Sequence, residues 1–158
     1  MSLDLLAIAD ALAARYAPAN VTPPTNAATS TAYPNIRAAT ARVPNNIPAT
    51  PYVIVELPSG ELTIESRTSR HGEHVFDVWF LYSKATGDLP RDKAAMLAWI
   101  SVLLDQTYGQ HKLGLAPIVD KANVDSYEPD VATYGGDSYH AWHLVVRVWT
   151  TDTINLVP

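Results

Sequence analysis

The five histidines of this sequence offer the widest choice of chemistry, because an imidazole can bind a metal ion or transfer a proton. The closest pair, His140 and His143, lies in a segment with β-strand alternation, where an odd spacing sends two side chains to opposite faces. His71 and His74 have the same odd spacing. We therefore interpret all five, His111 included, as surface or half-buried side chains, and we predict no metal site and no cofactor site.

A serine close to two histidines is a second candidate for chemistry. The segment Gly136-Asp137-Ser138 stands just before His140 and His143. A catalytic triad needs its serine on a rigid strand-to-helix turn, with a base and an orienting acid close to it in space. Here the glycine and the aspartate are typical of a hairpin turn. We predict no catalytic residue, and a small α+β enzyme or ligand-binding domain with its site near these histidines stays the alternative of a different class.

Carboxylates form the third candidate, because two acids facing each other across a cleft can hydrolyse a glycoside. Four of them, Glu56, Glu61, Glu65 and Asp77, fall on strands that we predict to be neighbours. Alternation places Glu61 and Glu65 opposite the apolar residues of their own strand, as expected for a strand face in water. These two glutamates therefore favour a solvated surface over an acid pair.

Asp77 differs from the other carboxylates, because alternation gives it the same strand face as apolar and aromatic residues. We expect it to pair with Arg147 or Lys84, or to lie at a subunit contact. The tryptophans are spaced as core and sheet-face residues, and a minority of them could anchor an interface. They are Trp79, Trp99, Trp142 and Trp149.

Composition narrows the class of protein. The chain has 158 residues, which suits one domain, and a formal net charge of -5 without a cluster of basic residues for nucleic acid. There is no cysteine, so disulfides and thiolate metal sites are excluded. No glycine-rich phosphate loop occurs. We expect no signal peptide, because Asp4 and Asp10 interrupt the first apolar stretch, and no membrane span.

Hydrophobic periodicity predicts the elements that position these residues. A first helix over 5–16 would begin after Ser2 as N-cap and end before Pro18. A second and longer helix would run from Arg91 to Tyr108, with Gly109 as its C-terminal cap and Trp99 on its buried side. We predict strands over 35–43, at an edge, and over 52–57, 61–66, 73–84, 118–134 and 138–151.

Turn residues predict how the strands connect. Pro58-Ser59-Gly60 would join 52–57 and 61–66 as a hairpin, and Gly135-Gly136-Asp137 would join the last two strands as a C-terminal hairpin. Strand 73–84 carries aromatic residues on both faces, so we expect it to be central and covered on both sides. Pro129 indicates an edge or bulged strand. Strands on either side of one helix favour an α+β fold with a mostly antiparallel sheet.

The segment 17–51 is a long, proline-rich arm. It has two charged residues, Arg37 and Arg42, and is otherwise mostly alanine, threonine, asparagine and proline. Such a composition cannot build a core of its own, and a long connection of this kind is usually functional or disordered. We therefore expect an extended arm on a single α+β domain of residues 1–158, and we expect the arm to lie across a neighbouring subunit.

This layout resembles the tail terminator (tail completion) proteins of long-tailed bacteriophages. The resemblance lies in an amphipathic helix ending near Tyr16, and in the segment from Ile36-Arg37 through VPNNIP to the strand YVIVEL. It continues in the strand HVFDVWFLY, the helix RDKAAMLAWISVLLDQTY and the closing strand HAWHLVVRVWTT, and so covers nearly the whole chain. The arm 17–51 is longer than the core of that family leads us to expect.

The resemblance implies a structural protein of the virion, not an enzyme. Members form a homo-oligomeric ring, expected to be a hexamer, at the head-proximal end of the tail tube, where the ring stops tube polymerisation. The implied partners are the tail tube protein, a head–tail connector or neck protein, and phage DNA that passes through the lumen without sequence readout. The implied location is the tail or neck of a virion assembled in the host cytoplasm. Another neck, head-closure or baseplate protein is the alternative within the same class.

Overall fold

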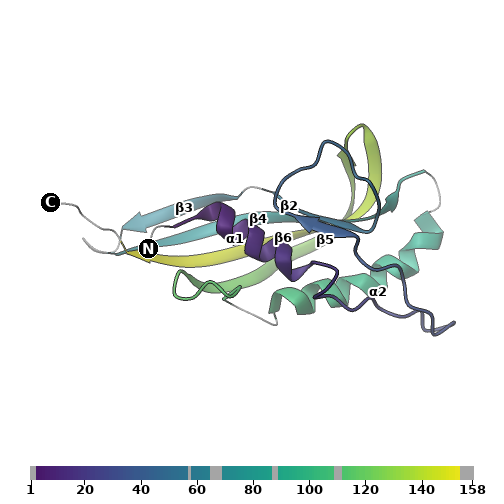
Figure 1. Cartoon of the computed structure of the whole chain (residues 1–158), viewed down its shortest axis with the longest axis horizontal. Coiled ribbons are helices and arrows are strands. Elements are labelled where there is room, and N and C mark those ends of the chain that lie inside the picture. Colours follow the sequence, from purple (N-terminus) through teal and green to yellow (C-terminus); the bar gives the residue numbers. More distant parts are fainter. Residues whose placement is uncertain (1–2, 57, 65–68, 87–88, 109–111, 154–158) are drawn as a thin grey trace.

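The computed structural model describes residues 3–56, 58–64, 69–86, 89–108 and 112–153 (Figure 1). Two helices and a six-stranded, mostly antiparallel sheet lie within these residues, so the predicted α+β class is confirmed. In chain order the elements are α1 (Leu5–Arg15), β1 (Ala38–Thr40), β2 (Tyr52–Val55), β3 (Ser59–Ile64), β4 (Ser69–Lys84), α2 (Leu89–Tyr108), β5 (Val119–Tyr134) and β6 (Asp137–Thr153).

Helix α1 begins two residues later than an N-cap at Ser2 predicts. The N-cap is Asp4, whose Oδ1 accepts hydrogen bonds from the backbone N–H of Leu6 and Ala7, both at 3.0 Å. The predicted cap Ser2 lies outside the described residues. A carboxylate serves this position well, because it satisfies free N–H groups and faces the positive end of the helix dipole. The helix buries Ile8, Ala9, Leu12 and Ala13, as its apolar spacing predicts.

The sheet has the strand order β1-β2-β4-β6-β5, with β3 paired to β4 beside that path. The predicted hairpin of 52–57 with 61–66 is therefore wrong. Strands β2 and β3 do not pair with each other but follow one another along the same side of β4. The physical reason is the length of β4, which has 16 residues and offers room for two short strands in succession. Ser59 and Gly60 belong to β3 and not to a turn.

Strands β4 and β6 form the centre of the sheet. Their antiparallel register runs from Ser69↔Thr153 to Lys84↔Tyr139, with one irregularity between Leu81 and Ser83. Strand β5 pairs antiparallel with β6 across Gly135 and Gly136, which both have a positive φ. It lies at the sheet edge and has two register shifts, as Pro129 predicts. The predicted central position of strand 73–84 is confirmed.

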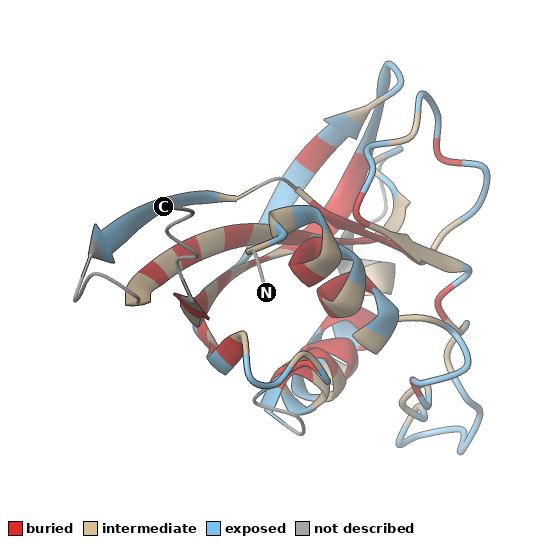
Figure 2. Cartoon of the chain, turned by 60° about the vertical axis from the view of Figure 1, so that its left-hand side comes forward, coloured by how far each residue is buried: buried red, intermediate tan, exposed pale blue. Residues whose placement is uncertain are grey.

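Both helices pack on one face of this sheet, and burial alternates along β4 over 71–80 and along β6 over 142–150 (Figure 2). Trp99 of α2 is fully buried, and its ring lies 5.0 Å from that of Phe80, centroid to centroid. The Trp142 indole donates a hydrogen bond of 2.7 Å to the carbonyl of Met96, which ties β6 to α2. This helix-covered face holds most of the core.

The proline-rich segment 17–51 packs in part on its own chain. Val21, Ile36, Ala41 and Ile47 are buried, and Ala38–Thr40 form β1, which pairs with β2 in parallel. Between these anchors the chain runs in exposed loops, chiefly at residues 27–32 and 42–46, apart from the half-buried Pro44. The predicted edge strand within 35–43 thus exists as three residues. An extended arm lying across a neighbour is not part of this single-chain structure.

Candidate interaction surface

The sheet face turned away from the helices is buried in some parts and exposed in others. Odd-numbered residues of β4 and β6 project to it, and from Arg147 to Thr151 they are half-buried while their even-numbered neighbours are buried. We call this the outer face. The prediction that strand 73–84 is covered on both sides is therefore correct for the helix side and only in part for the outer face, where Leu81 is buried and Asp77 is not.

An imidazole between two carboxylates marks the middle of the outer face. The His143 ring stacks on Trp79 with 4.2 Å between centroids and 10° between planes. Its Nε2 lies 2.7 Å from Asp77 Oδ1, and its Nδ1 lies 3.6 Å from Glu128 Oε1. The prediction that Asp77 pairs with Arg147 or Lys84 is wrong, because pairing of β4 with β6 places Trp79 directly opposite His143. The carboxylates and the stacked indole hold the ring in one orientation.

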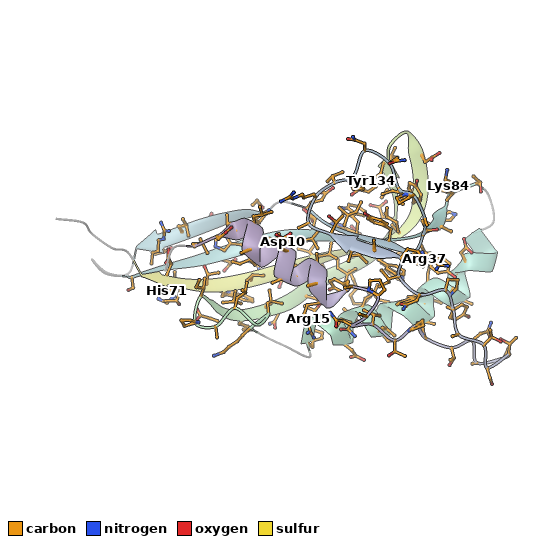
Figure 3. All side chains as sticks on the ribbon, viewed as in Figure 1. Asp10, Arg15, Arg37, His71, Lys84 and Tyr134 are labelled. Carbon is orange, nitrogen blue, oxygen red and sulfur yellow. The ribbon has the colours of Figure 1, made fainter. Side chains whose placement is uncertain are left out.

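A second polar cluster occupies the outer face toward the end that holds His71 in Figure 3. The Arg147 guanidinium contacts Glu73 of β4 and lies 2.5 Å from Asp125 Oδ2 of β5. Beside it, the Lys121 ammonium lies 4.7 Å from the centroid of the Trp149 ring. These side chains span three strands and are partly in water, so each contact adds little to stability.

The opposite end of the outer face is covered by the proline-rich segment. Ile47 packs there on a small apolar cluster with Tyr52, Ile54, Leu81, Ala132, Tyr139 and Ala141. The loop reaches the turn between β5 and β6, where a Cβ on Gly135 would lie 2.7 Å from the carbonyl oxygen of Asn45. Tyr134 donates a hydrogen bond of 2.8 Å to Glu56. Burial, followed by this carboxylate, raises the pKa of the Tyr134 phenol well above its usual range.

The alternative of a site formed by Ser138 with His140 and His143 finds no convergence among the described residues. His140 is buried on the helix side and His143 lies on the outer face, as their spacing predicts. Ser138 is exposed, and its hydroxyl lies 3.2 Å from that of Thr133. Among the described residues no hydrogen bond joins Ser138 to either histidine.

The remaining candidates are also dispersed. His74 is buried against Thr150, with 3.2 Å between Nε2 and Oγ1, and burial lowers its pKa. His71 faces the other way and lies 3.0 Å from the Thr151 hydroxyl. Glu61 is exposed on β3. Glu65 and His111 lie outside the described residues, and within those described no three His, Asp or Glu side chains gather as metal ligands.

Two hollows lie away from these histidines. A wide depression of about 660 Å³ is lined by polar and aromatic groups of the proline-rich segment, β4 and α2, among them Tyr33, Tyr82 and Asp92. A narrow apolar groove of about 210 Å³ lies between α2 and β5. Its walls are Lys93, Met96, Leu97, Pro129 and Trp142.

The groove adjoins an exposed strand edge, that of β5. Every residue from Asp125 to Val131 on β5 is exposed, including the large apolar side chains of Tyr127 (51%) and Val131 (53%). At the far edge of the sheet, β1 lies between the exposed residues Arg37 and Arg42. Figure 3 shows Arg37 beside β2. In the sequence, Pro129 and the two arginines indicate strands at a sheet edge. They do not predict the order of the strands in the sheet.

No protein-family model and no curated protein sequence matches this chain. Of the two helices in the described residues, neither combines the length and the apolar composition that crossing a membrane requires.

Proposed function

We propose that this chain is a structural virion protein, a tail terminator that forms a ring at the head-proximal end of the phage tail tube. In this proposal the ring stops tube polymerisation and provides the head–tail joining surface. The chain acts by binding copies of itself, the tail tube protein and a neck or connector protein, and it carries out no catalysis.

The observation that carries the proposal is the pair of unlike strands, β1 and β5, that end the strand order of the sheet. Among the described strands, β3 pairs only with β4 and adds a further open edge, on the same side of β4 as β2. The strand order ends in β1 on one side and in β5 on the other, and these edges differ in length and in charge. A head-to-tail ring needs two different patches on each subunit, and it closes when the rotation between neighbours fits. One subunit that carries both patches on opposite sides supports such a ring.

The proline-rich segment supplies a further contact in this proposal. Its loop from Asn26 to Thr31 is exposed apart from Asn26 and is held by backbone hydrogen bonds of 2.8 Å within the loop. A preformed loop loses little conformational freedom on binding. We propose that this loop, and not the whole of 17–51, lies across the neighbour, because Ile36 and Ala41 are needed in the chain's own core.

Passage of DNA without readout is compatible with the charge of the chain. The subunit has a formal net charge of -5, and Lys84 is paired with Asp137 at 2.6 Å between Nζ and Oδ2. An acidic lumen would repel phosphate and so avoid trapping the duplex. A lumen lined by Arg37, Arg42 and Lys84 would contradict this part of the proposal.

Electron microscopy of the purified chain, alone and mixed with tail tubes of the phage that encodes it, tests the function. The proposal expects closed rings and tubes that carry one ring at a single end. A chain that stays monomeric and leaves the tubes uncapped would overturn it. Binding to heads or baseplates without capping tubes would favour the alternative of another neck, head-closure or baseplate protein.

The loop contact has its own test. Ala28→Glu places a charge at the exposed loop, and Ala94→Glu places the same charge on an exposed position of α2. We expect A28E to weaken ring formation in light scattering, while A94E leaves it unchanged. Rings of A28E that are as stable as those of the parent chain would remove the loop from the assembly contact.

A further inference from the structure

The two open edges of the sheet lie at the same level along the strands. Following the register across the sheet, Thr40 of β1 is level with Ile54, Trp79, His143 and finally Glu128 of β5. Two rows further, Ala38 is level with Asp130 in the same way. A sideways contact between two copies in the same orientation therefore brings β1 of one copy to Glu128–Asp130 of the other.

Strand direction favours the same contact. β1 runs parallel to β2, and each of the pairs β2–β4, β4–β6 and β6–β5 is antiparallel, so β1 and β5 run in opposite directions. When a second copy stands beside the first in the same orientation, its β1 meets β5 as an antiparallel neighbour. Antiparallel pairing is used by every strand pair of the described sheet except β1–β2, and here it would extend the sheet from one subunit into the next.

The charges at the two edges are complementary. Arg37 and Arg42 flank β1, and within the described residues neither guanidinium forms an ion pair. On β5, the carboxylate of Asp130 accepts a hydrogen bond from the next backbone N–H, and that of Glu128 lies 3.6 Å from His143. The segment 17–51 holds no acidic residue, so its charge is purely positive. Opposite charges at the rim of a contact set its register and partner.

Exposed apolar side chains accompany the charges on both edges. Val43, 54% exposed, follows Arg42 beside β1. On the other edge, Leu97 is 55% exposed and lines the groove between α2 and β5, and Val131 of β5 is 53% exposed. Burying such side chains supplies the non-directional part of a contact that the charges alone would not hold.

We infer that the β5 edge around Glu128 and Asp130 binds a second copy of this chain through its β1 edge, with Arg37 and Arg42 facing these carboxylates. The inference rests on the proposed function, since it names the contact that closes the ring. The β1 and β5 edges of one chain lie on opposite sides of its sheet, so they meet only between copies. Pro129 lacks an N–H and so weakens backbone pairing with any strand, β1 included, which leaves the charges to select the partner.

Charge reversal tests the contact with the full chain. We compare R37E/R42E and E128R/D130R with the control K112E/D105R, which changes exposed residues away from both edges. Circular dichroism checks that every variant is folded, and mass photometry measures the assembly. We expect each edge variant alone to need at least tenfold more protein to form rings, and the control to behave as the parent chain.

Mixing the two edge variants tests whether the charges of the two edges face each other. An acidic β1 edge then faces a basic β5 edge, and a basic β1 edge faces an acidic β5 edge, so alternating rings should form at the parental concentration. The quadruple variant R37E/R42E/E128R/D130R should also assemble alone. Edge variants that form rings as well as the parent chain would overturn the edge contact and leave the ring in place. Variants that stay impaired after mixing would overturn it too, because the charges would then serve another partner.

A cysteine pair gives an independent readout, because the natural chain has no cysteine. In T40C/E128C the two new thiols lie at opposite edges of one chain, so a disulfide formed with an added oxidant must join two copies. We expect a ladder of linked chains on a non-reducing gel, against none beyond a dimer for either single variant. If the double variant assembles but does not cross-link, the edge contact is overturned. If the parent chain never assembles, both the edge contact and the proposed function are overturned.

Discussion

The two faces of the sheet are built in different ways. On the helix-covered face, apolar residues of α1, α2, β4 and β6 form one continuous core in which side chains such as Trp99 and Phe76 are fully buried. On the outer face, a small cluster under the proline-rich segment lies at one end, and stacked rings and ion pairs occupy the rest. The first face depends on local periodicity, whereas the second depends on which distant segment happens to cover it.

This difference separates stability from recognition in the molecule. Burial of apolar surface is the main source of folding free energy, and most of it lies on the helix side. Partly exposed ion pairs contribute little to folding but can choose a partner. We therefore expect substitutions on the helix side to change the free energy of unfolding, and substitutions at the outer face and its edges to change assembly.

The largest effect is expected from Trp99→Ala on the helix side. Removing a fully buried indole leaves a cavity and should lower the free energy of unfolding by about 3–5 kcal/mol. The matched change Trp149→Ala removes a half-buried indole of the outer face, which stacks with Lys121, and should lower it by about 1 kcal/mol. Urea denaturation measures both. Equal losses would break the distinction between the two faces.

Gly135→Ala tests whether the proline-rich segment packs against the turn between β5 and β6. Both turn glycines have a positive φ, of 60° at Gly135 and 85° at Gly136, which penalises alanine by about 1–2 kcal/mol. A Cβ at Gly135 would also meet the Asn45 carbonyl, while nothing lies within 4 Å of one at Gly136. We expect thermal unfolding to show a larger loss for G135A than for G136A. Identical losses would mean that residues 45–46 do not rest on the turn.

Tyr16→Phe sharpens the account of the helix layer. The Tyr16 hydroxyl lies 2.5 Å from the Thr107 hydroxyl and joins the end of α1 to the end of α2, and burial raises the pKa of this phenol to about 12. Losing one buried hydrogen bond should lower the free energy of unfolding by about 1–2 kcal/mol. Tyr127→Phe, at an exposed position, should leave it within about 0.5 kcal/mol of the parent chain. If Y16F left the free energy of unfolding unchanged, the two helix ends would be joined by packing alone.

The smallest effect concerns pH. Burial lowers the pKa of His74 below its ordinary 6.5, so below that pH the unfolded chain binds a proton that the folded chain does not. The contribution of His74 to the free energy of unfolding is therefore intact above pH 6.5 and declines on acidification, by at most about 1.4 kcal/mol per pH unit. H74Q should flatten the dependence of the free energy of unfolding on pH between pH 5 and 6.5, as measured by urea denaturation at each pH. An H74Q chain that keeps the slope of the parent chain would contradict this role of His74.

The elements that the sequence predicts best are those with local periodicity. The faces of β4 and β6 follow from alternation alone, and the apolar side of α2 follows from helical spacing with Trp99 on it. The extension of β4 back to Ser69 could not be predicted, because Arg70, His71 and Gly72 have no strand character. They adopt strand geometry because β6 and β3 pair with them on both sides.

The errors share a cause in contacts between distant residues. Pro58-Ser59-Gly60 has the composition of a turn, yet β3 continues alongside β4 because that strand is long enough to receive it. Asp77 was placed on the correct face, but its partner His143 depends on the register of β4 with β6, which no local pattern encodes. In the proline-rich segment, a few apolar residues such as Ile36 and Ile47 are enough to anchor a chain whose average composition argues against a core.

The long antiparallel pairing of β4 with β6 restricts which insertions these two strands can accept. Fifteen consecutive levels are matched across the two strands, apart from one irregularity. An insertion of two residues in each strand would lengthen the sheet by about 7 Å and keep every side chain on its present face. A single inserted residue in one of them, unless a bulge like the one between Leu81 and Ser83 absorbs it, would move every residue beyond it to the opposite face of the sheet. We therefore expect the lengths of β4 and β6 to vary by even numbers of residues.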